Sequence, residues 1–230
     1  MQFIFSIGGK MKKYFTMAGL MITLLMITLA CALSSSILPS SSPETLPTIE
    51  SIPTSIPGWE KFEAKGVELW LPESYDGGNV SEDLNTVVEK IKALGPEFEN
   101  MAAVIEQNPD MFAIWAFDSK IGASGSLTSA AITFEKVLSV ISIDTYLDAA
   151  QNQLPASFVV TDRQILKLND YDAGRLMIEF SISGINGKEL MYAIKNGNVV
   201  WVITYGTSAD EFDQRLPVFE KSAITFNVND

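Results

Sequence analysis

The side chains that could do chemistry in this chain are few, because it contains no histidine and a single cysteine. Histidine is the side chain most often used for proton transfer near neutral pH, and it is the commonest zinc ligand. Its absence excludes Ser–His–Asp and Cys–His catalysis and every metal site that contains histidine. The composition leaves open only catalysis by a pair of carboxylates or by a serine–lysine pair.

One place for such a pair is the run Asp118-Ser119-Lys120, which follows an apolar stretch and precedes a Gly/Ser loop at 122–126. Exposed loops of this kind often carry function. A serine nucleophile activated by lysine needs a lysine that burial has deprotonated, and neighbouring residues on one loop rarely provide it. We therefore expect a polar surface loop here, and we assign no catalytic residue to the chain.

A second candidate is the run Asn169-Asp170-Tyr171-Asp172-Ala173-Gly174, which places several oxygen ligands before a glycine, as calcium loops do. Such a loop also needs a bidentate glutamate further on, and the next one, Glu179, falls within a predicted strand. Asn and Asp commonly bond their own backbone in turns. The pattern therefore favours an ordinary turn, and we assign no metal ligand and no cofactor.

The aromatic side chains are candidates for contacts with a partner. All four tryptophans, Trp59, Trp70, Trp115 and Trp201, lie in predicted strands, where such residues usually fill the core. Trp59, at the start of the predicted domain, and Tyr75, in a predicted loop at 72–80, are better candidates for exposed contacts.

The one cysteine, Cys31, stands where an apolar segment meets a Ser/Pro-rich stretch. Lys12 and Lys13 precede an uncharged run at 14–30 that ends in Thr28-Leu29-Ala30. This arrangement resembles bacterial lipoprotein signal peptides, although those usually carry leucine where this chain has Thr28. The resemblance implies that Cys31 is lipidated after cleavage. The alternatives are an uncleaved anchor, since 14–33 is about long enough to span a bilayer, and an ordinary cleaved secretory signal.

These features predict four segments. Residues 1–10 are an upstream extension if translation begins at Met11, and 11–30 are the signal peptide. Residues 31–57 are a Ser/Pro-rich tether, in which five prolines should prevent helices and sheet ladders. Residues 58–230 are one globular domain that has no cysteine for a disulfide.

The charge of the mature chain limits its partners. Removal of the residues before Cys31 leaves 13 basic residues against 28 acidic ones, a net charge near −15. Such a surface repels the phosphates of nucleic acid and also anionic lipid, so we expect neither as a ligand of the domain.

The elements that must position these residues can be predicted from apolar spacing. Turn residues at Lys65-Gly66 separate two short strands. Ser81 should cap a helix, and Gly95-Pro96 should end it. Ser208 and Glu211 form the pattern of a capping box. The predicted strands cover 59–64, 67–71, 111–117, 130–137 and 225–228, and the predicted helices begin after 81, 96, 142 and 208.

The C-terminal half contains two hairpin signals, Asn186-Gly187 and Asn196-Gly197, because both dipeptides tolerate positive φ. They should join strands at 175–183, 188–195 and 198–205 into an antiparallel meander. The third of these strands is apolar on both faces and should be central. Together the elements predict an α+β fold, in which a mostly antiparallel central sheet is flanked by helices.

Three stretches carry a family resemblance: GVELWLP, then LNDYDAGRLMIEF with GKELMYAIKNGNVVWVITY, and finally DEFDQRLPVFEKSAITF. The pattern resembles the PsbP-like fold, shared with Mog-type Ran-binding proteins and several bacterial lipoproteins. It implies an α/β/α sandwich over most of 59–228, and it carries no partner-binding residue across.

Together these observations predict an envelope lipoprotein of the bacterial type. Its domain would lie outside the cytoplasm, attached to the membrane through a lipid on Cys31 or an uncleaved anchor, and would bind or scaffold an envelope protein without catalysis. The alternative is a carboxylate-based enzyme or a calcium-dependent module at the cell envelope.

Overall fold

The computed structural model describes residues 48–49, 55–182 and 184–229. Cys31, the predicted signal peptide and most of the predicted tether lie outside these residues. None of the helices within the described ranges is both long and apolar enough to cross a membrane.

The main sheet has the strand order β1-β7-β8-β9-β10-β6-β5-β4, and it is antiparallel except where β1 joins β7. A smaller sheet has the order β11-β3-β2. The α+β class and the mostly antiparallel sheet predicted above are confirmed. The strands of the main sheet are β1 (Thr48–Ile49), β4 (Tyr75–Asn79), β5 (Phe112–Asp118), β6 (Ser129–Lys136), β7 (Phe158–Leu168), β8 (Tyr171–Ile182), β9 (Ile185–Asn196) and β10 (Val199–Ser208). Those of the smaller sheet are β2 (Trp59–Ala64), β3 (Val67–Pro72) and β11 (Asn227–Val228).

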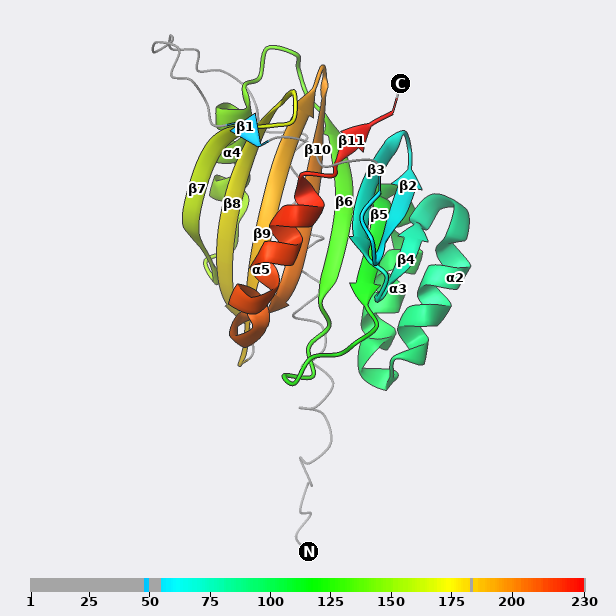
Figure 1. The fold of residues 1–230 in the computed structure, drawn as a ribbon. Coiled ribbons are helices and arrows are strands. Elements are labelled where there is room, and N and C mark those ends of the chain that lie inside the picture. The colour runs from blue at the N-terminus through cyan, green and yellow to red at the C-terminus, as the bar shows by residue number, and fades with distance from the viewer. Residues whose placement is uncertain (1–47, 50–54, 183, 230) are drawn as a thin grey trace, which may run out of the picture.

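Helices pack against both faces of the main sheet, as Figure 1 shows. On one face, α5 (Ala209–Ala223) and the smaller sheet enclose the largest apolar core. On the other face, α4 (Ile143–Gln153) covers β8 and β9, while α2 (Val80–Ala93) and α3 (Glu99–Gln107) cover β5. The residues of β9 alternate between the two faces, so that Tyr192 joins one core and Met191 the other.

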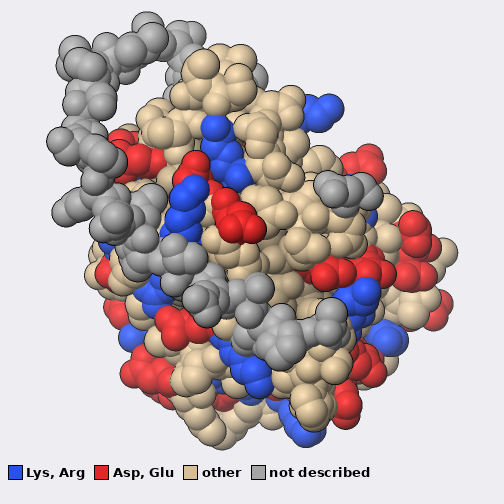
Figure 2. All heavy atoms as spheres, turned by 45° about the horizontal axis from the view of Figure 1, so that its top comes forward, with Lys and Arg blue, Asp and Glu red and all other residues tan. Residues whose placement is uncertain are grey.

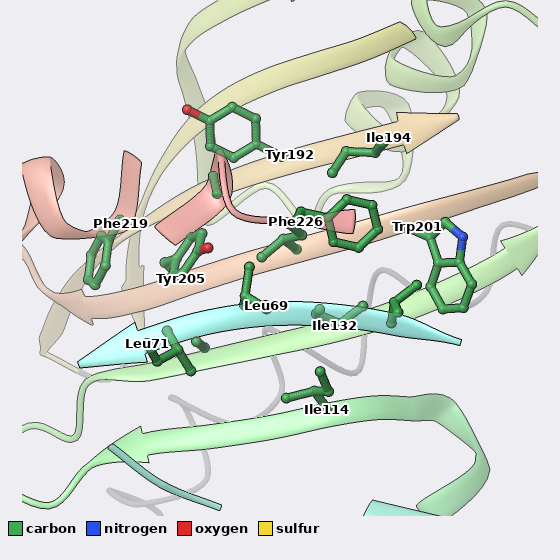
Figure 3. Close-up of a cluster of buried hydrophobic side chains, with 14 of the residues drawn as sticks. Leu69, Leu71, Ile114, Ile132, Tyr192, Ile194, Trp201, Tyr205, Phe219 and Phe226 are labelled. Atoms are coloured by element: carbon green, nitrogen blue, oxygen red, sulfur yellow. The ribbon is translucent and has the colours of Figure 1, made fainter. Parts of the chain in front are cut away.

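Aromatic and aliphatic side chains converge on the core beneath α5 (Figure 3). The rings of Tyr205 and Phe219 stack with their centroids 5.1 Å apart. The Tyr205 hydroxyl donates to Ser222 Oγ at 2.9 Å, and Ser222 Oγ donates to the Trp70 carbonyl oxygen at 2.6 Å. Because these bonds link β10, α5 and β3, they fix the helix between the two sheets.

Strand β10 lies between β9 and β6 and is buried on both faces, which confirms the prediction of a central strand. A hairpin turn also follows the Asn196-Gly197 signal, but it lies one residue later than predicted, at Gly197 (φ +61°) and Asn198, because Asn196 still pairs with Val199. The other predicted turn, Asn186-Gly187, is wrong, because both residues already pair within β9 and the turn precedes them at Gly184, φ +84°. The ring of Phe180 packs directly over Gly187, and this contact explains the glycine there.

Two strands were not predicted. Strand β7 was missed because a bulge between Val160 and Asp162 disrupts its alternation. Strand β4 lies within the predicted loop at 72–80, because a short segment that contains Gly77 and Gly78 has no strand pattern. In addition, the tether forms a short parallel pair at Thr48–Ile49 with Lys167–Leu168, so the expectation that it would make no sheet ladder is wrong.

Two predicted helix caps are also wrong. Asn79, not Ser81, caps α2, since its Oδ1 accepts from the backbone N–H groups of Ser81 and Glu82. Ser208 occupies the N-cap position of α5, but its side chain makes no capping bond.

Candidate functional site

Glu211 does not complete a capping box, because its carboxylate reaches across to the Gly/Ser loop at 122–126. Glu211 Oε1 accepts from the Ser124 N–H at 3.1 Å and from Ser124 Oγ at 2.8 Å, while Oε2 accepts from Arg215 Nε at 3.2 Å. The bonds from Ser124, aided by Arg215, lower the pKa of Glu211. The loop is therefore held against α5.

The run Asp118-Ser119-Lys120 contains no serine–lysine pair of the kind considered above. Asp118 is buried and accepts from Arg215 Nη1 at 2.7 Å. Ser119 Oγ donates to the carbonyl oxygen of Ser74 at 2.8 Å, and Lys120 is exposed to solvent. An exposed lysine lacks the burial that a serine–lysine pair requires of its base. The observed contacts are those of a structural connection between β5 and α5.

The run Asn169–Gly174 forms the turn between β7 and β8 and the start of β8. Asn169 has φ +53°, and its Nδ2 donates to the carbonyl oxygens of Ile224 and Phe226. Asp172 forms an ion pair with Lys167 at 2.7 Å. Within the part of the chain that the structure describes, no three His, Cys, Asp or Glu residues lie close enough together to hold a metal ion.

Of the two aromatic residues predicted to be exposed, Tyr75 is in fact buried, at 5% exposure, since it lies on β4 rather than in a loop. Burial, with the nearby Asp118 charge, raises the pKa of its phenol far above the ordinary value. Trp59 is half-buried, and Lys221 Nζ lies 4.7 Å from the centre of its ring.

A cavity that was not predicted opens beside α5, over β7, β8 and β9. Its volume is about 450 Å³. Strands supply one wall and the last turns of α5 the other, and the lining contains both apolar and polar side chains. The lining residues are Gln164, Leu166, Arg175, Tyr192, Glu220, Lys221 and Ile224. We call this space the Arg175 cavity.

Arg175 is the buried charge of the cavity, and two carboxylates hold it. Its Nη1 lies 2.5 Å from Asp162 Oδ2, and its Nη2 lies 3.0 Å from Glu220 Oε1. Burial opposes the guanidinium charge, but Tyr192 and Glu220 outweigh this effect and raise the pKa of Arg175. Burial also raises the pKa of Tyr192, so its phenol stays protonated and can donate a hydrogen bond.

Lys221 differs from Arg175 because it is exposed and forms no ion pair with any residue whose position is described. The cavity thus combines a fixed cation, a free cation and an apolar wall of Leu166 and Ile224. Pockets that bind ligands typically join an apolar lining with a few convergent polar groups. On the face drawn in Figure 2, acidic and basic side chains intermingle, so no broad field of one sign covers it.

Glu189 is a second charged residue that was not singled out from the sequence. It lies on β9 opposite Gly206, is 5% exposed, and its Oε2 has no hydrogen-bond partner among the described residues. Burial raises the pKa of this carboxyl to about 8. Glu189 is therefore mostly protonated at neutral pH.

Comparisons with known proteins support the fold only. No family model matches the chain, and a search of curated proteins finds no match either. Among solved structures, the chain is similar to LpqN of Mycobacterium tuberculosis, with 10% identity and a TM-score of 0.50 over 71% of this chain and 83% of that one. It is also similar to cyanobacterial PsbP of Synechocystis, with 12% identity and a TM-score of 0.46 over 76% of this chain and 95% of that one. A third similar structure is the Ran-binding protein Mog1p of Saccharomyces cerevisiae, with 8% identity and a TM-score of 0.46 over 75% of this chain and 96% of that one. The similarity to LpqN supports the PsbP-like fold that the sequence pattern predicted.

Proposed function

We propose that this chain is a lipid-anchored extracytoplasmic binding domain without catalytic activity, and that it takes its partner at the Arg175 cavity. The observation that carries the proposal is the cavity itself. It is preformed, it has an apolar wall, and its polar side chains come from three strands and one helix. LpqN is described as involved in cell envelope biogenesis. That description concerns LpqN, and it agrees with an envelope role here.

The chemistry of the cavity favours a partner segment that presents an acceptor or a carboxylate next to an apolar side chain. Arg175 is already bound to Asp162 and Glu220, so it serves mainly as a fixed donor. Lys221 gives up only its contact with the Trp59 ring when it turns toward a ligand. A surface cation–π contact of this kind is worth about 0.5–1 kcal/mol, so Lys221 can be recruited at small cost.

The anchor is tested by mass spectrometry of the mature N-terminus and by fractionation of cells. Wild type should carry a lipid on Cys31 and remain with the membrane, and Cys31→Ser should be released. If Cys31→Ser stays with the membrane, the anchor is an uncleaved segment. A wild-type protein released without lipid would refute anchoring.

The binding site is tested with Lys221→Glu in the membrane-bound protein. In-cell cross-linking should give a discrete product that Lys221→Glu reduces at least tenfold. The matched control is Lys92→Glu, which makes the same charge change on the exposed surface of α2. Equal cross-linking by both variants would refute the Arg175 cavity as the site.

The alternative of a carboxylate enzyme or calcium-dependent module makes the opposite prediction. Replacing Asp170 and Asp172 by Asn should then abolish activity, whereas a binding domain retains it. Calcium that bound the folded state alone would raise the melting temperature. We expect no shift.

A further inference from the structure

Two aliphatic side chains project into solvent from the loop between β6 and α4. Leu138 is 67% exposed and Val140 is 83% exposed. Within the described ranges, the other large apolar residues with substantial exposure are Val159 at 58% and Ile121 at 40%. Leu138 and Val140 are therefore the most exposed of these residues, and they belong to one loop.

The loop is held in place, so the exposure of these two residues does not depend on a loose backbone. The Val137 N–H donates to the Asn198 carbonyl oxygen at 2.8 Å, and the Ile141 N–H donates to that of Leu138 at 3.0 Å. Lys195 Nζ donates to the Ser139 carbonyl oxygen at 2.8 Å. Val137 and Ile141 pack inward on the core beneath α4. The intervening residues are consequently held outward, and we call Leu138 and Val140 the apolar tip.

The apolar tip lies at the end of the sheet where the tether joins it (Figure 1). Thr48 of β1 pairs with Lys167 of β7. Lys167 pairs with Asp172 of β8, and Asp172 pairs in turn with Lys195 of β9. Lys195 is the residue that binds the loop. Strands lie about 4.8 Å apart, so the five steps from β1 to β6 cover roughly 24 Å. The tether and the tip therefore face the same side of the molecule.

Basic side chains stand beside the tip on this acidic protein. Lys136 is exposed and precedes the loop, and Lys195 is bound to it. Acidic groups also lie at this end, among them Glu135, Asp144, Asp170 and Asp172; Asp144 is paired with Arg163 and Asp172 with Lys167. Aliphatic residues flanked by lysine suit the boundary between acyl chains and phosphate headgroups, where lysine can reach the phosphates.

We propose that the apolar tip inserts into the surface of the membrane that carries the anchor, so that the domain is held against the lipid by two points. This inference rests on the anchoring proposed above. Sixteen residues separate Cys31 from Thr48, and the fully extended chain between the two spans at most about 60 Å. The tether alone thus permits many positions of the domain. A weak second contact becomes effective because the anchor raises its local concentration.

The test uses the full-length lipidated protein in phosphatidylcholine vesicles. Leu138→Cys, Val140→Cys and Val159→Cys are each labelled with an environment-sensitive fluorophore, since the lipid on Cys31 leaves the introduced thiol as the only free one. Val159 is the matched control, because it is an exposed aliphatic residue at the opposite end of β7 from β1. Nitroxide-labelled lipids should quench the probes at 138 and 140 several-fold more than the probe at 159.

The outcomes separate the two proposals. If the wild-type protein does not float with the vesicles, anchoring fails and this inference fails with it. If it floats but quenching is equal at all three positions, anchoring stands and the inference is overturned. Probes at 138 and 140 that escape lipid quenching but are shielded in cells would assign the tip to a protein partner, which also overturns it.

Discussion

Arg215 and Asp118 lie 97 residues apart in the sequence, yet Arg215 Nη1 donates to Asp118 Oδ2 at 2.7 Å. The side chain of Asp118 is 9% exposed and that of Arg215 is 20% exposed. The pair joins the end of β5 to α5, and Glu211 extends it to the Gly/Ser loop. Asp118, the carboxylate of the run considered above for catalysis, is thus engaged in holding α5 against the sheet.

Removing one member of this pair should destabilise the domain. Asp118→Ala leaves a largely buried guanidinium with only Glu211 as its partner, so we expect a loss of about 2 kcal/mol in the free energy of unfolding, measured by urea denaturation. Lys92→Ala breaks an exposed pair with Glu106 and should change stability by less than about 0.5 kcal/mol. Equal effects of the two variants would show that the Asp118–Arg215 contact does not stabilise the fold.

Glu189 should make stability depend on pH. Burial raises its pKa to about 8 in the folded state, above the ordinary value of 4.5. The folded state therefore binds this proton more tightly than the unfolded state does. The contribution of this proton to the free energy of unfolding is complete below pH 4.5. It declines by up to about 1.4 kcal/mol per pH unit as the pH rises toward 8, and it is lost above pH 8.

Glu189→Gln should remove this decline, because the amide carries no titrating proton. The measurement is the urea midpoint between pH 5 and 9 for both proteins, with the exposed Glu179→Gln as control. An unchanged slope in Glu189→Gln would mean that Glu189 is ionised and hydrated in the folded protein.

Neighbouring glycines in β4 should respond differently to alanine. A Cβ at Gly77 would lie 2.3 Å from the Trp115 carbonyl oxygen, whereas one at Gly78 would meet no atom within 4 Å. Both have positive φ, +131° and +147°, so both substitutions carry backbone strain. We expect Gly78→Ala to cost about 1–2 kcal/mol and Gly77→Ala clearly more, as thermal melts would show. Equal melting temperatures would contradict the close packing of β4 on β5.

Asn169 should stabilise the fold mainly through the hydrogen bonds of its side chain, and less through its backbone conformation. Asn169→Gly keeps the positive φ but loses both bonds to the C-terminal segment, so we expect destabilisation of about 1–2 kcal/mol. Hydrogen exchange at residues 227–229 should also become faster. Wild-type stability in Asn169→Gly would show that only the backbone conformation is needed at this turn.

Local patterns predicted the fold where each element follows its own periodicity. The spacing of Val87, Val88 and Ile91 identified the buried face of α2, and all three are at most 4% exposed. The apolar run in β10 identified a central strand. Prediction failed where tertiary contacts decide the outcome, as at the bulge in β7 and at Gly187, whose place in β9 depends on the Phe180 ring.

The Arg175 cavity could not be predicted for the same reason. Arg175 is the one charge in an otherwise apolar stretch of β8, and that is a weak signal of a buried ion pair. Its partners Asp162 and Glu220 lie 13 and 45 residues away from it in the sequence. Nothing in the sequence brings Lys221 to the same place. Only the pairing of β7 with β8 and the docking of α5 define the site.

The most direct test of this account is in-cell photo-cross-linking from the Arg175 cavity. A photoreactive residue replaces Gln164, which lines the cavity and is exposed, or Glu89 on α2 as the control. We predict a discrete envelope partner cross-linked from position 164, absent from position 89, and lost when Cys31→Ser releases the protein from the membrane. No product from position 164, or the same products from both positions, would contradict a binding domain that acts through this cavity.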